Sequence, residues 1–271
     1  MKKLRWPIAM MAVVVAVLLL PIMASANNSW GNYHWASLES PLPLSLGDNV
    51  SSKWDGALTQ ANSDWNASEV LNNSVDPGRT NPRKCNPGDG LVEICNAKYG
   101  FNGWLGIAGI WVSSDHITKG YVKVNDSYFN TSTYNTPDWR QMVMCQEIGH
   151  VFGLGHQDED FGNTNLGTCM DYTSSPWSNQ HPDQHDYDQL AAIYTHLDGY
   201  NSWASAPVDD GSGSVKGNGK GGGKGKKGDP PGQDISQWGK AISTDGKGRP
   251  DLFELDLGKG NKVFTHVLWA D

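Results

Sequence analysis

The amino-acid sequence predicts an α+β fold in which a mixed β-sheet packs against a small number of helices. An amphipathic pattern, with apolar residues at three- and four-residue steps, begins near Ser52. Short β-like runs follow this pattern, and two clear helix starts come after them. A succession of helix, strands and further helices is typical of an α+β domain, whereas regular alternation of strands and helices indicates an α/β domain.

The first predicted helix buries one face, and residues 27–50 before it, which include Pro41 and Pro43, are expected to be irregular. The run at residues 104–112 reads WLGIAGIWV, which is small and apolar enough for a buried strand, and its glycines predict the close approach of another backbone. The apolar face of the helix holds Trp54, Ala57, Leu58, Ala61 and Trp65. The β-like runs cover residues 69–75, 90–95, 104–112 and 121–124.

Two later helices have clear start signals. Residues 136–138 (TPD) offer a capping hydroxyl, a proline at the first helical position and an acid in the first turn. This helix is predicted to continue to Phe152 and to end at Gly153. Another helix is predicted to start at Asp183 and to place Leu190 and the following apolar residues on one face.

The first residues have the features of a secretory signal peptide. Three basic residues precede an apolar run at residues 8–20, and a small-residue A-x-A site follows at residues 24–26. The apolar run is shorter than the roughly 20 residues of a membrane-spanning helix, although an uncleaved N-terminal anchor remains the alternative. We therefore expect residues 1–26 to be removed and the mature protein to be secreted.

Beyond the signal peptide, composition divides the chain into three parts. Residues 27–205 are expected to form the main domain, and residues 206–232, rich in Gly and Lys, a flexible linker. Within residues 233–271, two strand-like runs flank the turn sequence GKGN, which predicts a short β-hairpin tail. This tail is too short to be stable alone, so we expect it to dock on the main domain or on a partner.

Charge and cysteine content narrow the class of protein. The formal net charge of −8 argues against nucleic acid as a partner. The even number of cysteines in an exported chain predicts disulfide bonds. Proximity in sequence favours the pairs Cys85–Cys95 and Cys145–Cys169, and the two other connectivities stay open.

The most informative motif is Q-E-x-x-H-x-x-G-x-x-H, which starts at Gln146. Positions four apart lie on one face of a helix, so Gln146 and His150 point the same way, and Glu147 is displaced by one residue. Gly153 ends the helix and allows the chain to bring His156 toward the same point. Three protein ligands with an open fourth position are typical of catalytic zinc sites.

With Met170 following in the sequence TCMDY, this segment resembles the metzincin clan of zinc metallopeptidases, and most closely its matrixin-like members, over roughly residues 50–200. The resemblance implies a mixed sheet with an active-site helix, a methionine turn at Met170 and a C-terminal helix. It implies that His150 and His156 bind Zn²⁺, and that Glu147 is the base when zinc-bound water attacks a peptide bond. Tyr172 has the spacing of a tyrosine that contacts the metal or stabilises the oxyanion in some members.

The sequence departs from the family pattern at Gln146, where a zinc-binding histidine is expected. A carboxamide oxygen is a weaker zinc ligand than imidazole. The free energy of zinc binding at a structural site is about 10–16 kcal/mol, shared among four ligands. Losing most of the contribution of one ligand therefore weakens zinc binding by about two orders of magnitude. Gln146 is therefore expected to bind zinc through its oxygen, or else another side chain completes the site. The candidate substitutes are Asp158, His181 and His185.

The sequence thus predicts a secreted zinc-dependent endopeptidase that acts on a protein or peptide substrate as a monomer, without nucleic acid and without a membrane after signal cleavage. A metzincin-like protein that binds a partner without catalysis is the alternative, with or without a metal. Structural calcium is left open. The remaining histidines lack metal-binding spacing and are interpreted as ordinary surface or packed residues: His34, His116, His196 and His266.

Overall fold

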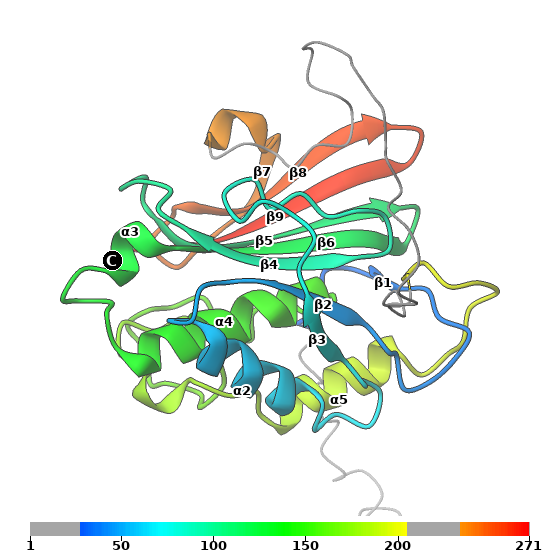
Figure 1. Cartoon of the computed structure of the whole chain (residues 1–271), viewed down its shortest axis with the longest axis horizontal. Helices are drawn as coiled ribbons and strands as arrows, with labels where there is room; N and C mark the ends of the chain where they lie inside the picture. The colour runs from blue at the N-terminus through cyan, green and yellow to red at the C-terminus, as the bar shows by residue number, and fades with distance from the viewer. Residues whose placement is uncertain (1–27, 205–233, 271) are drawn as a thin grey trace, which may run out of the picture.

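The computed structural model describes residues 28–204 and 234–270, so the predicted signal peptide and linker lie outside the described residues. It contains a nine-stranded mixed sheet, and the helices α2, α4 and α5 lie on one side of it (Figure 1). The helices are α2 (Asp55–Trp65), α3 (Asp126–Phe129), α4 (Pro137–Val151) and α5 (Gln184–Ile193), with 3₁₀ turns η1 (Pro176–Ser178) and η2 (Ile235–Gln237). The strands are β1 (His34–Trp35), β2 (Ser45–Asn49), β3 (Ser74–Pro77), β4 (Val92–Ala97), β5 (Trp104–Ser113), β6 (His116–Asn125), β7 (Lys240–Thr244), β8 (Pro250–Gly258) and β9 (Asn261–Trp269).

The strand order is β3-β2-β4-β6-β5-β9-β8-β7, and β1 pairs separately with β6. The half of the sheet from β3 to β6 is parallel, whereas β6, β5, β9, β8 and β7 pair in antiparallel fashion. The chain is therefore an α+β protein with a mixed sheet. Its C-terminal tail belongs to this sheet, because β9 pairs along β5 from Ser113↔Asn261 to Trp104↔Trp269.

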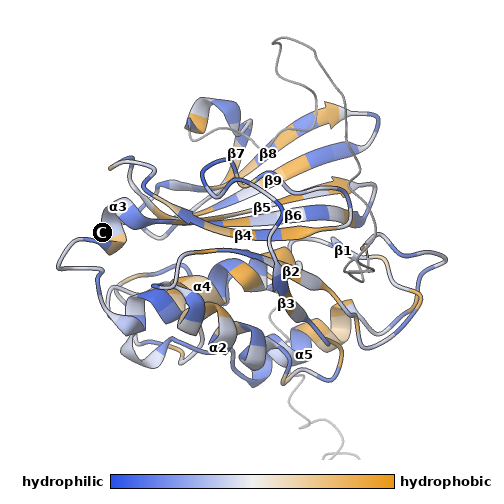
Figure 2. Cartoon of the chain, in the orientation of Figure 1, coloured by the Kyte–Doolittle hydropathy of each residue, from blue (hydrophilic) through white to orange (hydrophobic). Residues whose placement is uncertain are grey.

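The main hydrophobic core lies between the helices and the facing side of the sheet. Apolar residues follow the central strands and α4 (Figure 2). Large aromatic side chains fill this core, among them Trp54, which directly precedes α2, and Trp65 at the end of α2, both of which are fully buried. Because helix and sheet together bury these rings, α4 is held in a fixed position under β5 and β6.

Local signals explain the bounds of α4. The Thr136 hydroxyl accepts a hydrogen bond from the Trp139 N–H at 3.3 Å, and Pro137 occupies the first turn. Every residue from 141 to 151 is buried, as expected for a helix enclosed by the sheet and α2. The helix ends before Gly153, whose φ of +97° suits glycine, and a Cβ there would collide with the Tyr33 carbonyl oxygen.

The three predicted helices are present, and the cysteines pair as Cys85–Cys95 and Cys145–Cys169. The second disulfide joins α4 to the segment that contains Met170. The prediction that residues 27–50 are irregular is wrong, because β1 and β2 lie within them. β2 reads SLGDN, which carries no strong strand signal, and pairing with β3 and β4 on both sides fixes its conformation.

Within the described ranges, none of the helices has the length and apolar character that are needed to cross a membrane. The predicted hairpin at the end of the chain is formed by β8 and β9, and β7 adds a third strand that the sequence did not indicate.

Candidate metal centre

His150 lies in the last turn of α4 with its ring fully buried. Its Nδ1 is 2.8 Å from the Leu154 carbonyl oxygen, which can only accept, so Nδ1 carries the hydrogen. The lone pair of the neutral ring is therefore on Nε2, which has no hydrogen-bond partner among the described residues. Trp30 stacks on this ring, with 5.3 Å between the ring centroids, and helps to fix its orientation.

His156 follows the turn at Gly153, and only 2 % of its side chain is exposed. Its Nδ1 lies 3.4 Å from a carboxylate oxygen of Glu159. A carboxylate that accepts from one ring nitrogen leaves the other nitrogen as an electron-pair donor, which is the usual outer partner of a metal-binding histidine. In the described part of the chain, Nε2 of His156 likewise has no partner.

A third histidine, His266, reaches the same point from β9. It pairs with Ala108 of β5, and its ring is buried. Nε2 of His266 lies 3.3 Å from the Tyr172 hydroxyl oxygen, and that hydroxyl lies 3.2 Å from a carboxylate oxygen of Asp251. If Tyr172 donates to Asp251, it accepts from Nε2–H of His266, and the bare nitrogen is Nδ1. This atom has no partner within residues 28–204 and 234–270.

The three histidines form a compact group in which one ring nitrogen from each lies within 4.8 Å of the others. Burial is the largest cause that lowers the pKa of His150 and His266 well below the usual value, and the neighbouring imidazoles lower it further. Burial also lowers the pKa of His156 to about 3. All three rings are therefore neutral near pH 7, which is the form that binds metal ions.

Glu147 precedes His150 by three residues on α4 and is fully buried, with its carboxylate against the backbone of β5 at Gly106, where a Cβ would collide with it. Neither carboxylate oxygen has a hydrogen-bond partner in the part of the chain that the structure describes. Burial raises the pKa of Glu147 well above its usual value. A buried carboxylate without a partner is costly, and a nearby cation would offset this cost. The residues present therefore fit a metal ion.

Gln146 has a different environment. Its Nε2–H donates to the Cys169 carbonyl oxygen at 2.9 Å, so the side chain links α4 to the segment before Met170. Its Oε1 has no partner among the residues described. The hydrogen bond satisfies one end of a buried amide without any need for a metal.

The substitute ligands considered from sequence do not join the histidine group. Asp158 accepts the Asp160 N–H in a local turn, and His181 pairs with Asp64 at 2.7 Å. His185 is grouped with two neighbouring acids at the start of α5. The sequence, by contrast, indicates only an ordinary histidine at His266. A strand pairing between distant segments brings it to the site, and no local spacing could have indicated it.

Met170 and Tyr172 complete the surroundings. Met170 is fully buried, and a Cβ on Gly149 would meet its sulfur at 2.6 Å, so it packs against α4 one residue before His150. Tyr172 is also buried, and burial, followed by the charge of Asp251, raises its pKa well above the usual value. Tyr172 therefore keeps its proton and can hold His266 in place.

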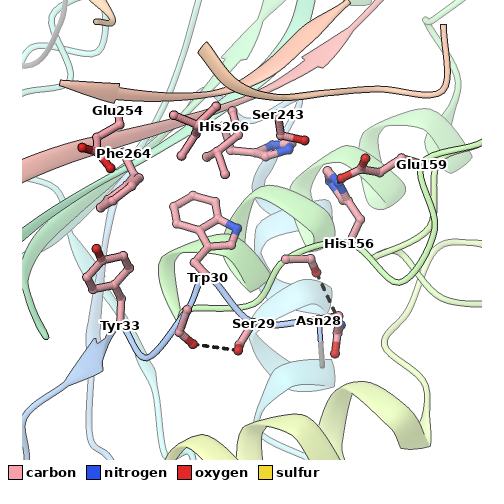
Figure 3. Close-up of a pocket in the computed structure, with 14 residues that line it drawn as sticks. Asn28, Ser29, Trp30, Tyr33, His156, Glu159, Ser243, Glu254, Phe264 and His266 are labelled. Carbon is pink, nitrogen blue, oxygen red and sulfur yellow. Dashed lines mark hydrogen bonds and ion pairs between the residues drawn. The ribbon is translucent and has the colours of Figure 1, made fainter. Parts of the chain in front are cut away.

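A cavity of about 410 Å³ opens onto His156 and His266 (Figure 3). One wall is the N-terminal segment around Trp30, and the opposite wall is the sheet face formed by β7, β8 and β9. A small molecule or a chain segment that enters this cavity would reach the two histidines, whereas Glu147 and His150 are not among its lining residues.

No protein-family model matches this chain, and no curated protein matches it in sequence.

Proposed function

We propose that the protein is a secreted zinc-dependent endopeptidase whose metal is held by His150, His156 and His266. The observation that carries the proposal is the convergence of three buried imidazole nitrogens that lack partners in the described structure. Three histidines and an open position favour zinc over calcium or magnesium, which prefer oxygen ligands. Bound zinc would polarise a substrate carbonyl and lower the pKa of water to about 7.

The role of Glu147 follows from its environment. A carboxylate whose pKa is raised by burial is a better proton acceptor near neutral pH than an exposed one. Glu147 is suited to accept a proton on one of its carboxylate oxygens and to return it to the leaving amine. Its position beside Gly106 leaves its oxygens without a competing hydrogen bond in the described structure.

In this proposal, Tyr172 and Asp251 act through His266. The hydrogen bonds from His266 to Tyr172 and from Tyr172 to Asp251 fix the ring of His266 and choose its tautomer. Met170 and Gln146 keep α4 packed against the turn below it. Gln146 thereby supports the helix, and the ligand expected at its position comes from β9 instead.

One observation favours the alternative, a metal-binding protein without peptidase activity. β9 pairs along β5, the strand that lies against Glu147, and an exposed edge of β5 could otherwise pair with an extended peptide. Glu147 itself is fully buried. A substrate must therefore reach the centre through the cavity at His156, or the tail must separate from β5 first.

The first test is the zinc content of the purified mature protein after dialysis against metal-free buffer, together with hydrolysis of an unfolded protein substrate. The proposal requires zinc at this centre and a chelator-sensitive activity. The Glu147→Gln variant should keep the zinc and lose the activity, because it retains shape and removes the proton acceptor.

A matched control is Glu69→Gln, which changes an exposed acid that is distant in sequence from Glu147. It should leave both the zinc content and the activity unchanged. Zinc at the three histidines without any activity in either protein would favour the inactive alternative. Absence of zinc from this centre in the folded protein would refute both readings.

The two disulfides are compatible with an oxidising compartment, in line with the proposed secretion.

A further inference from the structure

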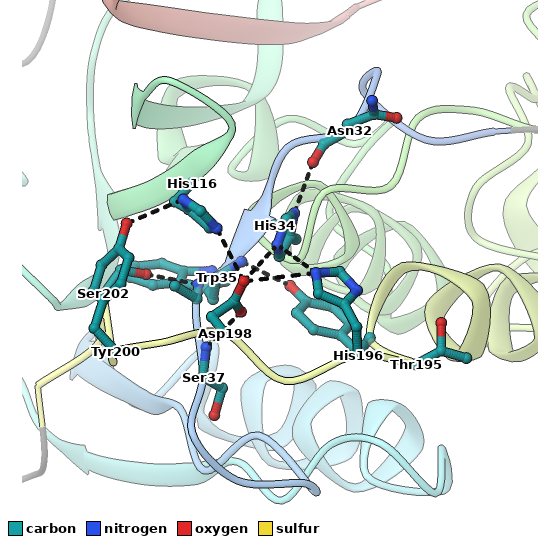
Figure 4. Close-up of polar contacts among 12 residues, drawn as sticks. Asn32, His34, Trp35, Ser37, His116, Thr195, His196, Asp198, Tyr200 and Ser202 are labelled. Carbon is teal, nitrogen blue, oxygen red and sulfur yellow. Dashed lines mark hydrogen bonds and ion pairs between the residues drawn. The ribbon is translucent and has the colours of Figure 1, made fainter.

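A second group of histidines surrounds Asp198 (Figure 4). His34 comes from β1, His116 from the first position of β6, and His196 from the chain that follows α5. All three Nε2 atoms face one carboxylate oxygen, Oδ1 of Asp198. Three segments that are distant in sequence therefore direct the same atom type to one point.

The distances within this group match those between the ligands of one metal ion. Nε2 of His34 and Nε2 of His196 are 3.1 Å apart, and each lies 3.6 Å from Oδ1 of Asp198. Zinc–ligand distances of about 2.0–2.1 Å in a tetrahedron place neighbouring ligand atoms roughly 3.3–3.4 Å apart. The three atoms are therefore spaced as three corners of a zinc site.

The hydrogen bonds around the group leave Nε2 of His34 and Oδ1 of Asp198 as electron-pair donors. Nδ1 of His34 lies 2.7 Å from the Asn32 carbonyl oxygen, which can only accept, so the lone pair of neutral His34 is on Nε2. The second oxygen of Asp198 accepts the Ser37 N–H at 2.9 Å, which turns Oδ1 toward the rings. These are the outer hydrogen bonds that orient metal ligands.

His116 touches the same oxygen, with 3.1 Å between its Nε2 and Oδ1 of Asp198. Its Nδ1 is 3.0 Å from the Tyr200 hydroxyl. The ligand atoms of His34, His196 and Asp198 all lie within 4.8 Å of one another, and His116 is not part of that group. We therefore assign it a positioning role on Asp198.

Access and donor chemistry also suit a metal ion. A cavity of about 410 Å³ is lined by both His34 and His196, so the group borders open space. The side chain of His196 is 53 % exposed, whereas those of His34 and Asp198 are only 10 % and 11 % exposed. Two imidazoles and one carboxylate form a donor set that favours zinc.

We infer that His34, His196 and Asp198 form a second zinc site, separate from the centre at His150. Zinc bound there would join β1, just beyond the Trp30 segment that lines the first cavity, to the end of α5. Three protein ligands leave one position open toward the cavity, and among the described residues this group holds no acid other than Asp198 itself. The inference does not depend on peptidase activity.

The test is the number of zinc ions per full-length mature chain, by elemental mass spectrometry, with affinities from competition against a chromophoric chelator. The His196→Ala variant should bind one zinc fewer than the unmodified protein, and affinity at that site should fall about 100-fold or more. His196 is half-exposed, so this substitution should not disturb folding. His181→Ala, at another exposed histidine, should change nothing.

The combined variant His150→Ala/His156→Ala separates this inference from the proposed function. If both sites exist, it should retain the zinc that His196→Ala loses. If the unmodified protein binds a single zinc that disappears only in His196→Ala, the second site stands and the proposed function fails. Equal zinc content and affinity in His196→Ala and the unmodified protein would overturn the inference and leave a hydrogen-bonded network around Asp198.

Discussion

Replacing His266 by alanine tests whether the C-terminal tail supplies a zinc ligand. The variant removes one of three imidazoles from the group at His150. A structural zinc site is worth about 10–16 kcal/mol over four ligands, so one ligand supplies roughly 3 kcal/mol. We therefore expect His266→Ala to weaken zinc binding about 100-fold. The measurement is competition with a chromophoric chelator at pH 7, with circular dichroism to confirm that the variant is folded.

A second substitution distinguishes loss of a ligand from damage to the fold. Residue 146 lies one helical turn before His150, the position where the sequence pattern expects a histidine. In the His266→Ala background, Gln146→His should restore most of the lost zinc affinity, because it returns an imidazole to the site from the helix. Gln146→Ala alone should reduce affinity by much less than His266→Ala does.

The reasoning is refuted if His266→Ala, correctly folded, binds zinc as tightly as the unmodified protein while Gln146→Ala does not. That result would make the Gln146 oxygen the third ligand. It would also mean that the Gln146 amide leaves the Cys169 carbonyl when the metal binds.

Three further predictions follow from the same site. Tyr172→Phe removes the hydroxyl that holds His266 and should lower zinc affinity about 10-fold, with unchanged affinity as the contrary result. Burial raises the pKa of Glu147, so the folded metal-free protein is destabilised at pH values above the unfolded pKa, where ionisation is favoured. Urea unfolding in the presence of chelator should therefore show Glu147→Gln to be more stable than the unmodified protein by roughly 1–3 kcal/mol at pH 8, and by less at pH 4. The double variant Cys145→Ala/Cys169→Ala opens a loop with a sequence separation of 24, and should lower the free energy of unfolding by roughly 3 kcal/mol in the same assay. An unchanged midpoint would show that packing around α4 suffices without the disulfide.

The features that could be predicted from sequence are those with local signals. A capping hydroxyl, a proline and Gly153 mark the two ends of α4, and a capping box marks the start of α5 at Asp183. The cysteine pairs were indicated by their short separations. By contrast, β2 has a weak strand signal and is formed by its neighbours on both sides.

The histidines of the two candidate metal sites show the same difference between local signals and contacts made by distant segments. The spacing of His150 and His156 is set within one helix and one turn, so it is visible in the sequence. His266 reaches the site only through its pairing with β5, and His34 meets His196 only because β1 lies near the end of α5. Pairings between distant segments leave no periodic trace in a single sequence, so isolated histidines of this kind could not be recognised.

A third ligand on β9, in place of a histidine at residue 146 of α4, changes how the proposed centre is assembled. A histidine at residue 146 would be in place as soon as the helix formed, whereas His266 is in place only when β9 has paired with β5. In the proposed site, zinc binding and docking of the tail therefore stabilise each other, since each favours the same arrangement. The same pairing covers the edge of β5, and Glu147, which lies against that strand, is fully buried. A tail that completes the metal centre thus also restricts access to it, and an active enzyme would have to admit its substrate through the cavity beside His156.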